Sequence, residues 1–118
     1  MGVHLLVELF GVKSELISKK KDVKKVLDRA ISKSKLKAIS CLYHQFKPFG
    51  VSCVYLLKSS HVSFHSWPEK SYVALDVFSC DRNEKKVFEF FKVVKDGFKP
   101  KRIIKKVIKR DYYEREIN

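Results

Sequence analysis

The sequence predicts an α+β fold, a two-layer sandwich in which two helices cover one face of a mainly antiparallel sheet. Apolar and polar side chains alternate in six short segments, which is the pattern of strands. In two longer segments the apolar side chains recur every three or four residues, which is typical of amphipathic helices. The order is strand, helix, four strands, helix, strand, and two helices can cover only one face of such a sheet. The other face must therefore meet water or another copy of the chain.

The N-terminal part is predicted to hold one helix between strands. The first strand covers residues 3–11. The helix begins at Asp22, whose carboxylate would cap the free amides of the first turn, and runs to about Lys33. Gly50 is available for a positive φ in the turn between the next two strands. The four central strands are expected at residues 36–46, 51–58, 61–67 and 71–79.

The C-terminal part is predicted to hold the second helix and the last strand. The helix is capped near Asp81 or Asn83 and closed by Gly97. A strand follows that includes residues 103–108. The polar segment 111–118 is expected to fray.

Length and composition limit the classes of protein to which the chain can belong. With 118 residues the chain has room for one domain, residues 1–118, and one core. The N-terminus shows no secretory leader, and no run approaches the roughly 18 apolar residues of a membrane helix. Cys41, Cys53 and Cys80 are odd in number and widely spaced, which argues against a disulfide framework or a zinc knuckle. We expect a cytoplasmic protein without a metal site, in which Cys41 and Cys53 are buried core residues.

The chain is strongly basic. Its 26 lysines and arginines against 13 acids give a net charge of +13. Ten of the basic residues fall in 13–37, and a second cluster runs over 95–110. Such a charge attracts nucleic acid without specifying it. A solvated, lysine-rich helix face is the favoured interpretation.

Residues 60–69, Ser-His-Val-Ser-Phe-His-Ser-Trp-Pro-Glu, depart from the pattern of an ordinary strand. Alternation places Ser60, Val62, Phe64 and Ser66 on one face and His61, Ser63, His65 and Trp67 on the other. A half-buried strand normally fills one face with aliphatic side chains. The hydroxyls and imidazoles gathered here indicate a functional site.

The same segment, followed by an apolar strand that carries Asp76 and then Cys80, resembles prokaryotic S-adenosylmethionine decarboxylase. Two other stretches are similar to that family. Gly-Val-His-Leu-Leu-Val-Glu-Leu-Phe-Gly at 2–11 is similar to its opening strand, and His-Gln-Phe-Lys-Pro-Phe-Gly-Val-Ser at 44–52 is similar to its His-x-Phe-x-Pro-x-Gly-Val-Ser turn. The three motifs span residues 2–80 in the family's order.

The resemblance implies a proenzyme that makes its own pyruvoyl cofactor by cutting its backbone before a serine. Here the cut would fall between Ser59 and Ser60, giving a β chain of 1–59 and an α chain of 60–118. The serine hydroxyl attacks the preceding carbonyl, the amide becomes an ester, and elimination followed by hydrolysis leaves the pyruvoyl group.

The resemblance also implies roles for the residues around the reactive serine. His65 corresponds to the proton-transfer group of the elimination, and Ser52 to the serine that bonds the processing intermediate. Cys80 occupies the position of the acid that returns a proton to the substrate carbon; an ordinary thiol, with a pKa of about 8.5, is protonated at neutral pH.

For the substrate, the resemblance implies a stacked adenine and a carboxylate that holds the ribose hydroxyls. Phe46 corresponds to the stacking ring and Glu69 to the ribose ligand, while Leu6 is a weaker candidate for the opposite wall. Trp67 either lines the pocket or belongs to the core. By analogy with duplicated relatives, the chain would form a homodimer with shared sites, in which Ser60 and Cys80 of one copy meet Phe46, Ser52, His65 and Glu69 of the other.

Two departures from the family pattern keep alternatives open. Ser59 stands where the family usually has Glu, and the loop after Cys80 lacks the usual Gly. S-adenosylmethionine is cationic, so Glu8, Glu69 and Asp76 must screen the basic charge locally. Besides the S-adenosylmethionine decarboxylase of spermidine synthesis, we consider an arginine or ornithine decarboxylase on the same scaffold. A third possibility is an unprocessed, non-enzymatic paralogue that binds RNA or a partner.

Overall fold

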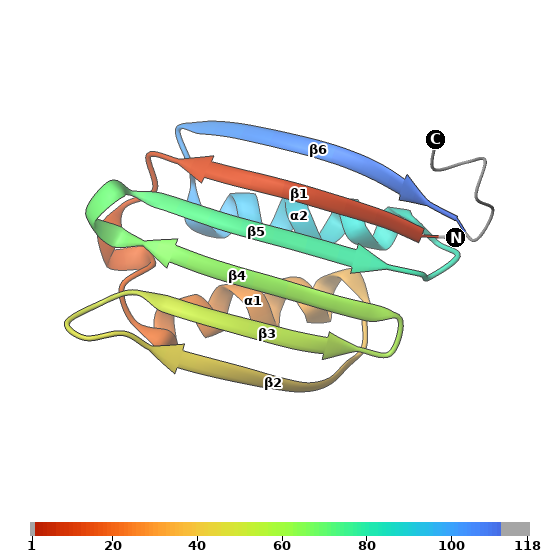
Figure 1. Cartoon of the computed structure of the whole chain (residues 1–118), viewed down its shortest axis with the longest axis horizontal. Coiled ribbons are helices and arrows are strands. Elements are labelled where there is room, and N and C mark those ends of the chain that lie inside the picture. Colours follow the sequence, from red (N-terminus) through yellow and green to blue (C-terminus); the bar gives the residue numbers. More distant parts are fainter. Residues whose placement is uncertain (1, 112–118) are drawn as a thin grey trace.

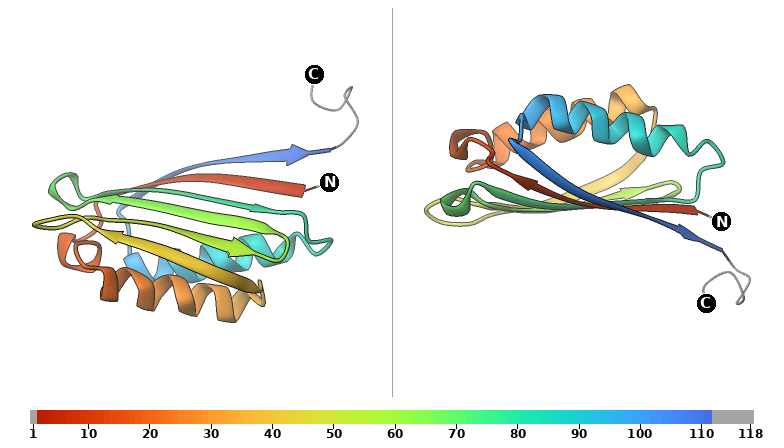
Figure 2. Two further views of the ribbon diagram at one scale, coloured as in Figure 1. Left: turned by 60° about the horizontal axis from the view of Figure 1, so that its bottom comes forward. Right: turned by 90° about the horizontal axis from the view of Figure 1, so that it is seen from above.

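The computed structural model describes residues 2–111 and has the predicted architecture. The elements follow one another as β1 (Gly2–Phe10), a 3₁₀ turn (Ser14–Leu16), α1 (Lys20–Ser34), β2 (Ala38–Gln45), β3 (Val51–Leu57), β4 (Ser60–Trp67), a 3₁₀ turn (Pro68–Lys70), β5 (Tyr72–Ser79), α2 (Lys85–Phe98) and β6 (Arg102–Arg110). The strands form one antiparallel sheet in the order β2-β3-β4-β5-β1-β6 (Figure 1). Figure 2 shows both helices on one face of this sheet, so the predicted two-layer α+β sandwich is confirmed.

The core lies between the sheet and the helices. Alternate residues of β1, Val3, Leu5, Val7 and Leu9, are buried against the helix layer. The largest fully buried side chains include Phe64 of β4 with Phe90 and Phe98 of α2. The Phe64 and Phe98 rings pack with centroids 5.7 Å apart. Burying one such ring contributes about 1.5–3 kcal/mol, so this contact joins the two layers firmly.

The start of α1 differs from the prediction, whereas its end lies within one residue of the predicted Lys33. The helix begins at Lys20, with Lys19 as the N-cap residue and no side-chain capping bond. Asp22 therefore lies within the first turn, where its negative charge still favours the positive end of the helix. At the other end Lys35 adopts the left-handed conformation, with φ of 64°, and stops the helix.

The start of α2 lies close to the prediction, with Glu84 as the N-cap residue, and the predicted end is wrong. The Asn83 side chain accepts a hydrogen bond from the Lys85 amide at 3.1 Å, as expected of a capping residue. Gly97 does not close the helix, which continues to Phe98 and ends with Lys99 in the left-handed conformation. Instead, Gly97 allows α1 to approach, since a Cβ there would lie 2.7 Å from Cγ1 of Val26. The expectation for 111–118 falls, apart from Asp111, outside the described residues.

No helix of the described residues covers the opposite sheet face, which we call the open face (Figure 2). Several large apolar side chains lie partly exposed along it: Leu6, Leu42, Val54, Leu56, Trp67, Ile104 and Ile108. Among the described residues, no helix is long and apolar enough to cross a membrane.

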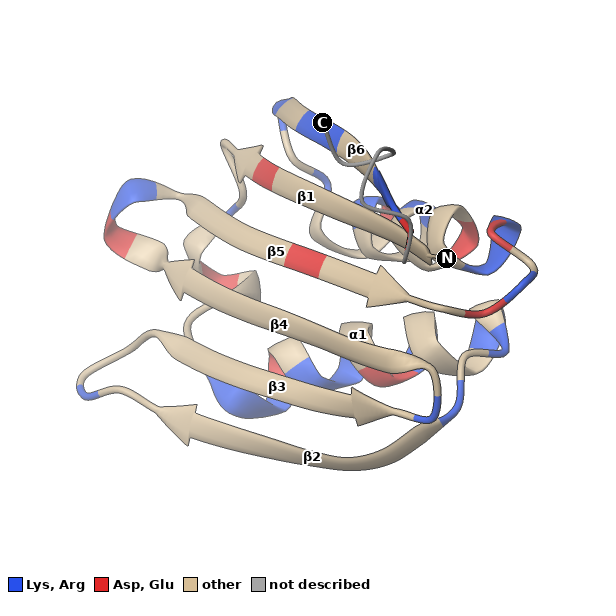
Figure 3. Ribbon diagram, turned by 45° about the vertical axis from the view of Figure 1, so that its right-hand side comes forward, with Lys and Arg blue, Asp and Glu red and all other residues tan. Residues whose placement is uncertain are grey.

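Charge is unevenly distributed over the sheet. Strands β1 to β5 carry no lysine or arginine, and their acidic residues are Glu8 of β1 and Asp76 of β5 (Figure 3). The basic residues that the structure describes lie on the helices, the turns and loops, and β6.

Candidate active site

Strand β4 presents the faces that its sequence predicts. Val62, Phe64 and Ser66 are buried toward the helices. His61, Ser63, His65 and Trp67 point to the open face, where His65 and Trp67 are exposed. Trp67, with 38% of its surface exposed, is therefore not a core residue. The unusual polar face of this strand is thus accessible to a ligand or to another chain.

Three predicted site residues, Ser59, Ser60 and Cys80, meet where β4 begins and β5 ends, and we call this place the cleavage end. The Ser59 carbonyl accepts a hydrogen bond from the Cys80 amide at 2.8 Å. Ser60 pairs with Ser79 across the ladder, and the hydroxyls of Ser59 and Ser79 lie 3.0 Å apart. Ser60 has φ of 155°, a value that residues with side chains seldom adopt. The backbone is therefore strained at Ser60, directly after the predicted scissile bond, and the carbonyl of that bond accepts a hydrogen bond from an amide.

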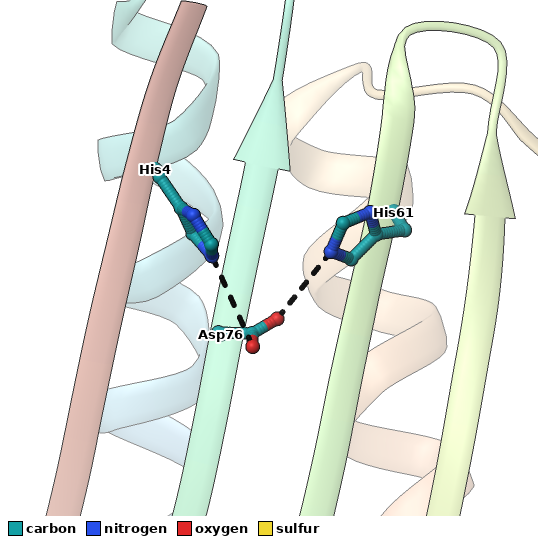
Figure 4. A group of neighbouring side chains, drawn as sticks. All are labelled: His4, His61 and Asp76. Atoms are coloured by element: carbon teal, nitrogen blue, oxygen red, sulfur yellow. Dashed lines mark ion pairs between the residues drawn. The ribbon is translucent and has the colours of Figure 1, made fainter. Parts of the chain in front are cut away.

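A second polar group adjoins the cleavage end (Figure 4). The Ser60 hydroxyl lies 3.2 Å from Nδ1 of His61, whose Nε2 lies 3.7 Å from Oδ1 of Asp76. Asp76 also accepts a hydrogen bond from the Ser63 hydroxyl at 3.0 Å, and its Oδ2 lies 3.9 Å from Nε2 of His4. Burial lowers the pKa of His4, although the Asp76 carboxylate opposes this effect.

His4, His61 and Asp76 bring two imidazoles and a carboxylate within 4.8 Å of one another. That donor set resembles the ligands of a transition metal. However, Asp76 already accepts a hydrogen bond from Ser63, and each of its oxygens faces one imidazole. We therefore interpret the group as a carboxylate held by the Ser63 hydroxyl between two imidazoles, neither of which lies within hydrogen-bond distance of it, and we assign no metal to it.

The remaining predicted residues gather near the other end of β4, and we call this place the binding end: Phe46, Ser52, His65, Trp67 and Glu69. They line a hollow of about 400 Å³. In it the Ser52 hydroxyl lies 2.6 Å from Nδ1 of His65. Residue Phe46 is 46% exposed, so its ring is accessible to a planar group that could stack on it.

Leu6 lies outside this hollow. It lines a neighbouring depression of about 490 Å³, together with Glu8, Ser63, Asp76 and Lys106. His65 borders both depressions. Leu6 is therefore brought near the binding end but not opposite Phe46 within the same hollow.

The cleavage end and the binding end do not meet within one chain. Ser60 and His65 lie five residues apart on a single strand. At about 3.3 Å per residue, they are separated by roughly 16 Å. Direct chemistry between the two side chains therefore requires a second copy of the protein.

Two histidines of this arrangement could not be predicted from the sequence, and one cysteine lies elsewhere than predicted. His4 and His61 had no assigned role, because nothing in their spacing shows that β1, β5 and β4 are neighbours in the sheet. Cys53 is buried as expected, and burial raises the pKa of its thiol to about 12. Cys41 is exposed, since it lies on the edge strand β2, where its sulfur is 3.9 Å from Nζ of Lys24.

Comparison with known proteins identifies the family. The family model described as S-adenosylmethionine decarboxylase matches residues 3–111. A Sulfurihydrogenibium protein is 41% identical over 110 residues, which cover 93% of this chain and 82% of that protein. An Archaeoglobus fulgidus protein is 41% identical over 100 residues, which cover 85% and 88%. Both are named S-adenosylmethionine decarboxylase proenzyme, which does not favour the arginine, ornithine or RNA alternatives.

A solved structure agrees with these matches. The crystal structure of the adenosylmethionine decarboxylase from Aquifex aeolicus is 36% identical to this chain and superposes with a TM-score of 0.90. The alignment covers 100% of this chain and 97% of that one. The fold, the length and the motifs therefore agree, and this chain belongs to the S-adenosylmethionine decarboxylase family.

Proposed function

We propose that this chain is a proenzyme that cleaves itself between Ser59 and Ser60 and then decarboxylates S-adenosylmethionine with the resulting pyruvoyl group. The products of cleavage would be a β chain of 1–59 and an α chain of 60–118. The observation that carries the proposal is the hydrogen bond between the Ser59 carbonyl and the Cys80 amide, beside the Ser60 hydroxyl. The decarboxylated product would serve as the aminopropyl donor in spermidine synthesis.

The residues of the cleavage end fit the formation of a pyruvoyl group. The strained φ of Ser60 favours moving the acyl group from nitrogen to oxygen, because the peptide bond that holds this conformation is then broken. The Cys80 amide stabilises the negative charge that develops on the Ser59 oxygen. Once formed, the pyruvoyl group supplies an electron sink, which accepts the electron pair that remains on the substrate when carbon dioxide leaves. The thiol of Cys80, an exposed free cysteine, is proposed to return a proton to the substrate carbon.

The binding end suits the nucleoside part of the substrate. Phe46 offers a ring face for the adenine, Trp67 offers a second aromatic wall, and the Glu69 carboxylate can accept hydrogen bonds from two ribose hydroxyls. The acidic residues of the open face, Glu8 and Asp76, favour a cationic sulfonium. The negative charge of these two residues would attract the positively charged substrate to the open face, although the protein as a whole is basic.

We further propose that the functional unit is a homodimer with two shared sites. The support is the separation of about 16 Å between Ser60 and His65, together with the uncovered apolar side chains of the open face. Packed face to face with strands running in opposite directions, two copies would bring the cleavage end of one against the binding end of its partner.

Two measurements test the proposed function. The intact mass of purified protein after warm incubation should show two chains divided before Ser60, and a single uncleaved chain would overturn the proposal. Release of labelled carbon dioxide from S-adenosylmethionine, arginine and ornithine should then be compared on the processed enzyme. We expect release from S-adenosylmethionine alone, and a preference for arginine or ornithine would contradict the substrate assignment.

A further inference from the structure

The cleavage end contains a candidate base of its own. This base, His61, lies closer to the Ser60 hydroxyl than His65 does. The Ser60 hydroxyl lies 3.2 Å from Nδ1 of His61. The other ring nitrogen of His61 faces Oδ1 of Asp76 at 3.7 Å (Figure 4). His65 belongs to the far end of the same strand, about 16 Å away. Within one copy of the chain, His61 is thus the imidazole that reaches the nucleophile.

We propose that His61 is the catalytic base of the first processing step, and that Asp76 is the residue that positions it. The inference rests on the proposed self-cleavage and adds to it the group that removes the hydroxyl proton. A nucleophilic serine, an imidazole within hydrogen-bond reach and a carboxylate behind the imidazole form the arrangement by which hydroxyls are activated in many hydrolases. Here the electrophile is the chain's own carbonyl.

Asp76 is held where it can select the required form of the imidazole. Its carboxylate accepts a hydrogen bond from the Ser63 hydroxyl of β4, and its other oxygen faces His4 of β1. Contacts with both neighbouring strands therefore hold the carboxylate in place. A carboxylate facing Nε2 favours the tautomer with the proton on Nε2. The lone pair of Nδ1 then points to the Ser60 hydroxyl and can accept its proton.

The step balances without any further reactant. Nδ1 of His61 takes the proton from the Ser60 hydroxyl as its oxygen forms a bond to the carbonyl carbon of Ser59. The carbonyl electron pair moves onto the oxygen, where it is stabilised by the Cys80 amide. The bond from that carbon to the Ser60 nitrogen then breaks, and the nitrogen receives the proton from His61. The amide has become an ester and a free amine.

This assignment divides the chemistry between two imidazoles. His61 acts before the ester exists, whereas the partner's His65 would remove the Cα proton of Ser60 in the elimination that follows. Loss of each imidazole should therefore stop the chain at a different chemical state. Hydroxylamine distinguishes the two states, because it cleaves an ester but leaves a peptide bond intact under mild conditions.

The experiment follows the self-cleavage rate of full-length protein by electrophoresis and intact mass, with and without hydroxylamine. The variant His61→Gln keeps a hydrogen-bonding side chain but cannot accept a proton at neutral pH. We expect its cleavage to be roughly 10²- to 10⁴-fold slower, the range of general-base catalysis, and hydroxylamine to release no fragments. His65→Ala should release two fragments with hydroxylamine. His44→Gln, which changes an exposed imidazole on β2, is the matched control and should cleave normally.

Two further variants separate catalysis from folding. His61→Ala should regain cleavage when free imidazole is added, a recovery that a misfolded protein would not show. Asp76→Asn should slow cleavage, and combining it with His61→Gln should add little, because a positioning residue has no effect once the group it positions is lost. Chelation with EDTA should leave the wild-type rate unchanged, since the group acts as a proton relay.

Each result decides between this inference and its rivals. If His61→Gln cleaves at the wild-type rate, or accumulates an ester that hydroxylamine cleaves, His61 is not the base of the first step. Loss of wild-type cleavage on chelation would instead assign a metal to His4, His61 and Asp76. Absence of cleavage in the wild-type protein would overturn the proposed function itself, which is a different outcome from a fault confined to His61.

Discussion

The two ends of the open face are built for different tasks, although they share a strand. At the cleavage end, Ser60 is already engaged with an imidazole, and the neighbouring carbonyl with an amide. At the binding end, Phe46 and Trp67 border an open hollow around the Ser52–His65 pair. Under the proposed shared sites, the first step of cleavage would be prepared within one chain, whereas the completed active site would need the binding end of a second copy.

Charge separates the helix layer from the open face in the same way. Within residues 2–111, the positive residues lie on α1, α2, β6 and the turns, while β1 and β5 carry the acids Glu8 and Asp76 (Figure 3). Glu8 is held by a hydrogen bond from the Tyr72 hydroxyl at 2.8 Å. The net charge of the chain is therefore a poor guide to the charge that a ligand on the open face meets.

The largest effect is expected from removing the nucleophile at the cleavage end. Ser60→Ala should abolish self-cleavage, because no hydroxyl remains to attack the Ser59 carbonyl. The matched control is Ser59→Ala, which should still be cleaved, since the group attacked at residue 59 belongs to the backbone. Electrophoresis after prolonged incubation measures both. Cleavage between residues 59 and 60 in the Ser60→Ala variant would show that another nucleophile acts.

The next effect separates the two functions of residue 80. Cys80→Ala should be processed at nearly the wild-type rate, because its backbone amide still reaches the Ser59 carbonyl. Turnover of S-adenosylmethionine should fall by roughly 10²-fold or more, since the proton donor is lost. Cys41→Ala, which removes another exposed thiol, should retain turnover. Equal turnover in the Cys80 and Cys41 variants would remove Cys80 from the mechanism.

A smaller effect is expected from the binding end. Glu69→Gln and Phe46→Ala should leave self-cleavage intact and raise KM for S-adenosylmethionine. Hydrogen bonds to a charged group contribute about 1.5–3 kcal/mol, so the Glu69 change should raise KM by roughly 10- to 100-fold. Steady-state kinetics on processed protein supply the measurement. A fall in kcat with unchanged KM would mean that these residues do not hold the nucleoside.

The sequence predicted most of the fold because its signals are local. Period-two alternation gave the two faces of β4 correctly, and Gly50 does adopt a positive φ, at 115°. The helix ends were less predictable, because Lys35 and Lys99 adopt the left-handed conformation that glycine usually takes. Their lysine side chains give no local sign of it.

Candidate site residues could be named from the sequence where they lie close together or match a family motif. His65 and Glu69 follow Ser60 within one motif, and the structure shows which of these residues lie together. The contacts of Asp76 with His4 and His61 depend on the strand order β4-β5-β1, which joins the N-terminal strand to the middle of the chain. That order is set by packing of the whole sheet, so a reading of local patterns could not reveal it.

Complementation between two inactive chains shows whether each active site combines residues of two copies. Ser60→Ala and His65→Ala chains, carrying different affinity tags, are coexpressed, and mixed dimers are isolated by both tags. In one of the two sites an intact Ser60 then meets the partner's intact His65. We predict that the His65→Ala chain becomes cleaved in the mixed dimer and that S-adenosylmethionine turnover appears, although neither variant alone completes processing. Mixed dimers in which both chains stay whole would contradict the account.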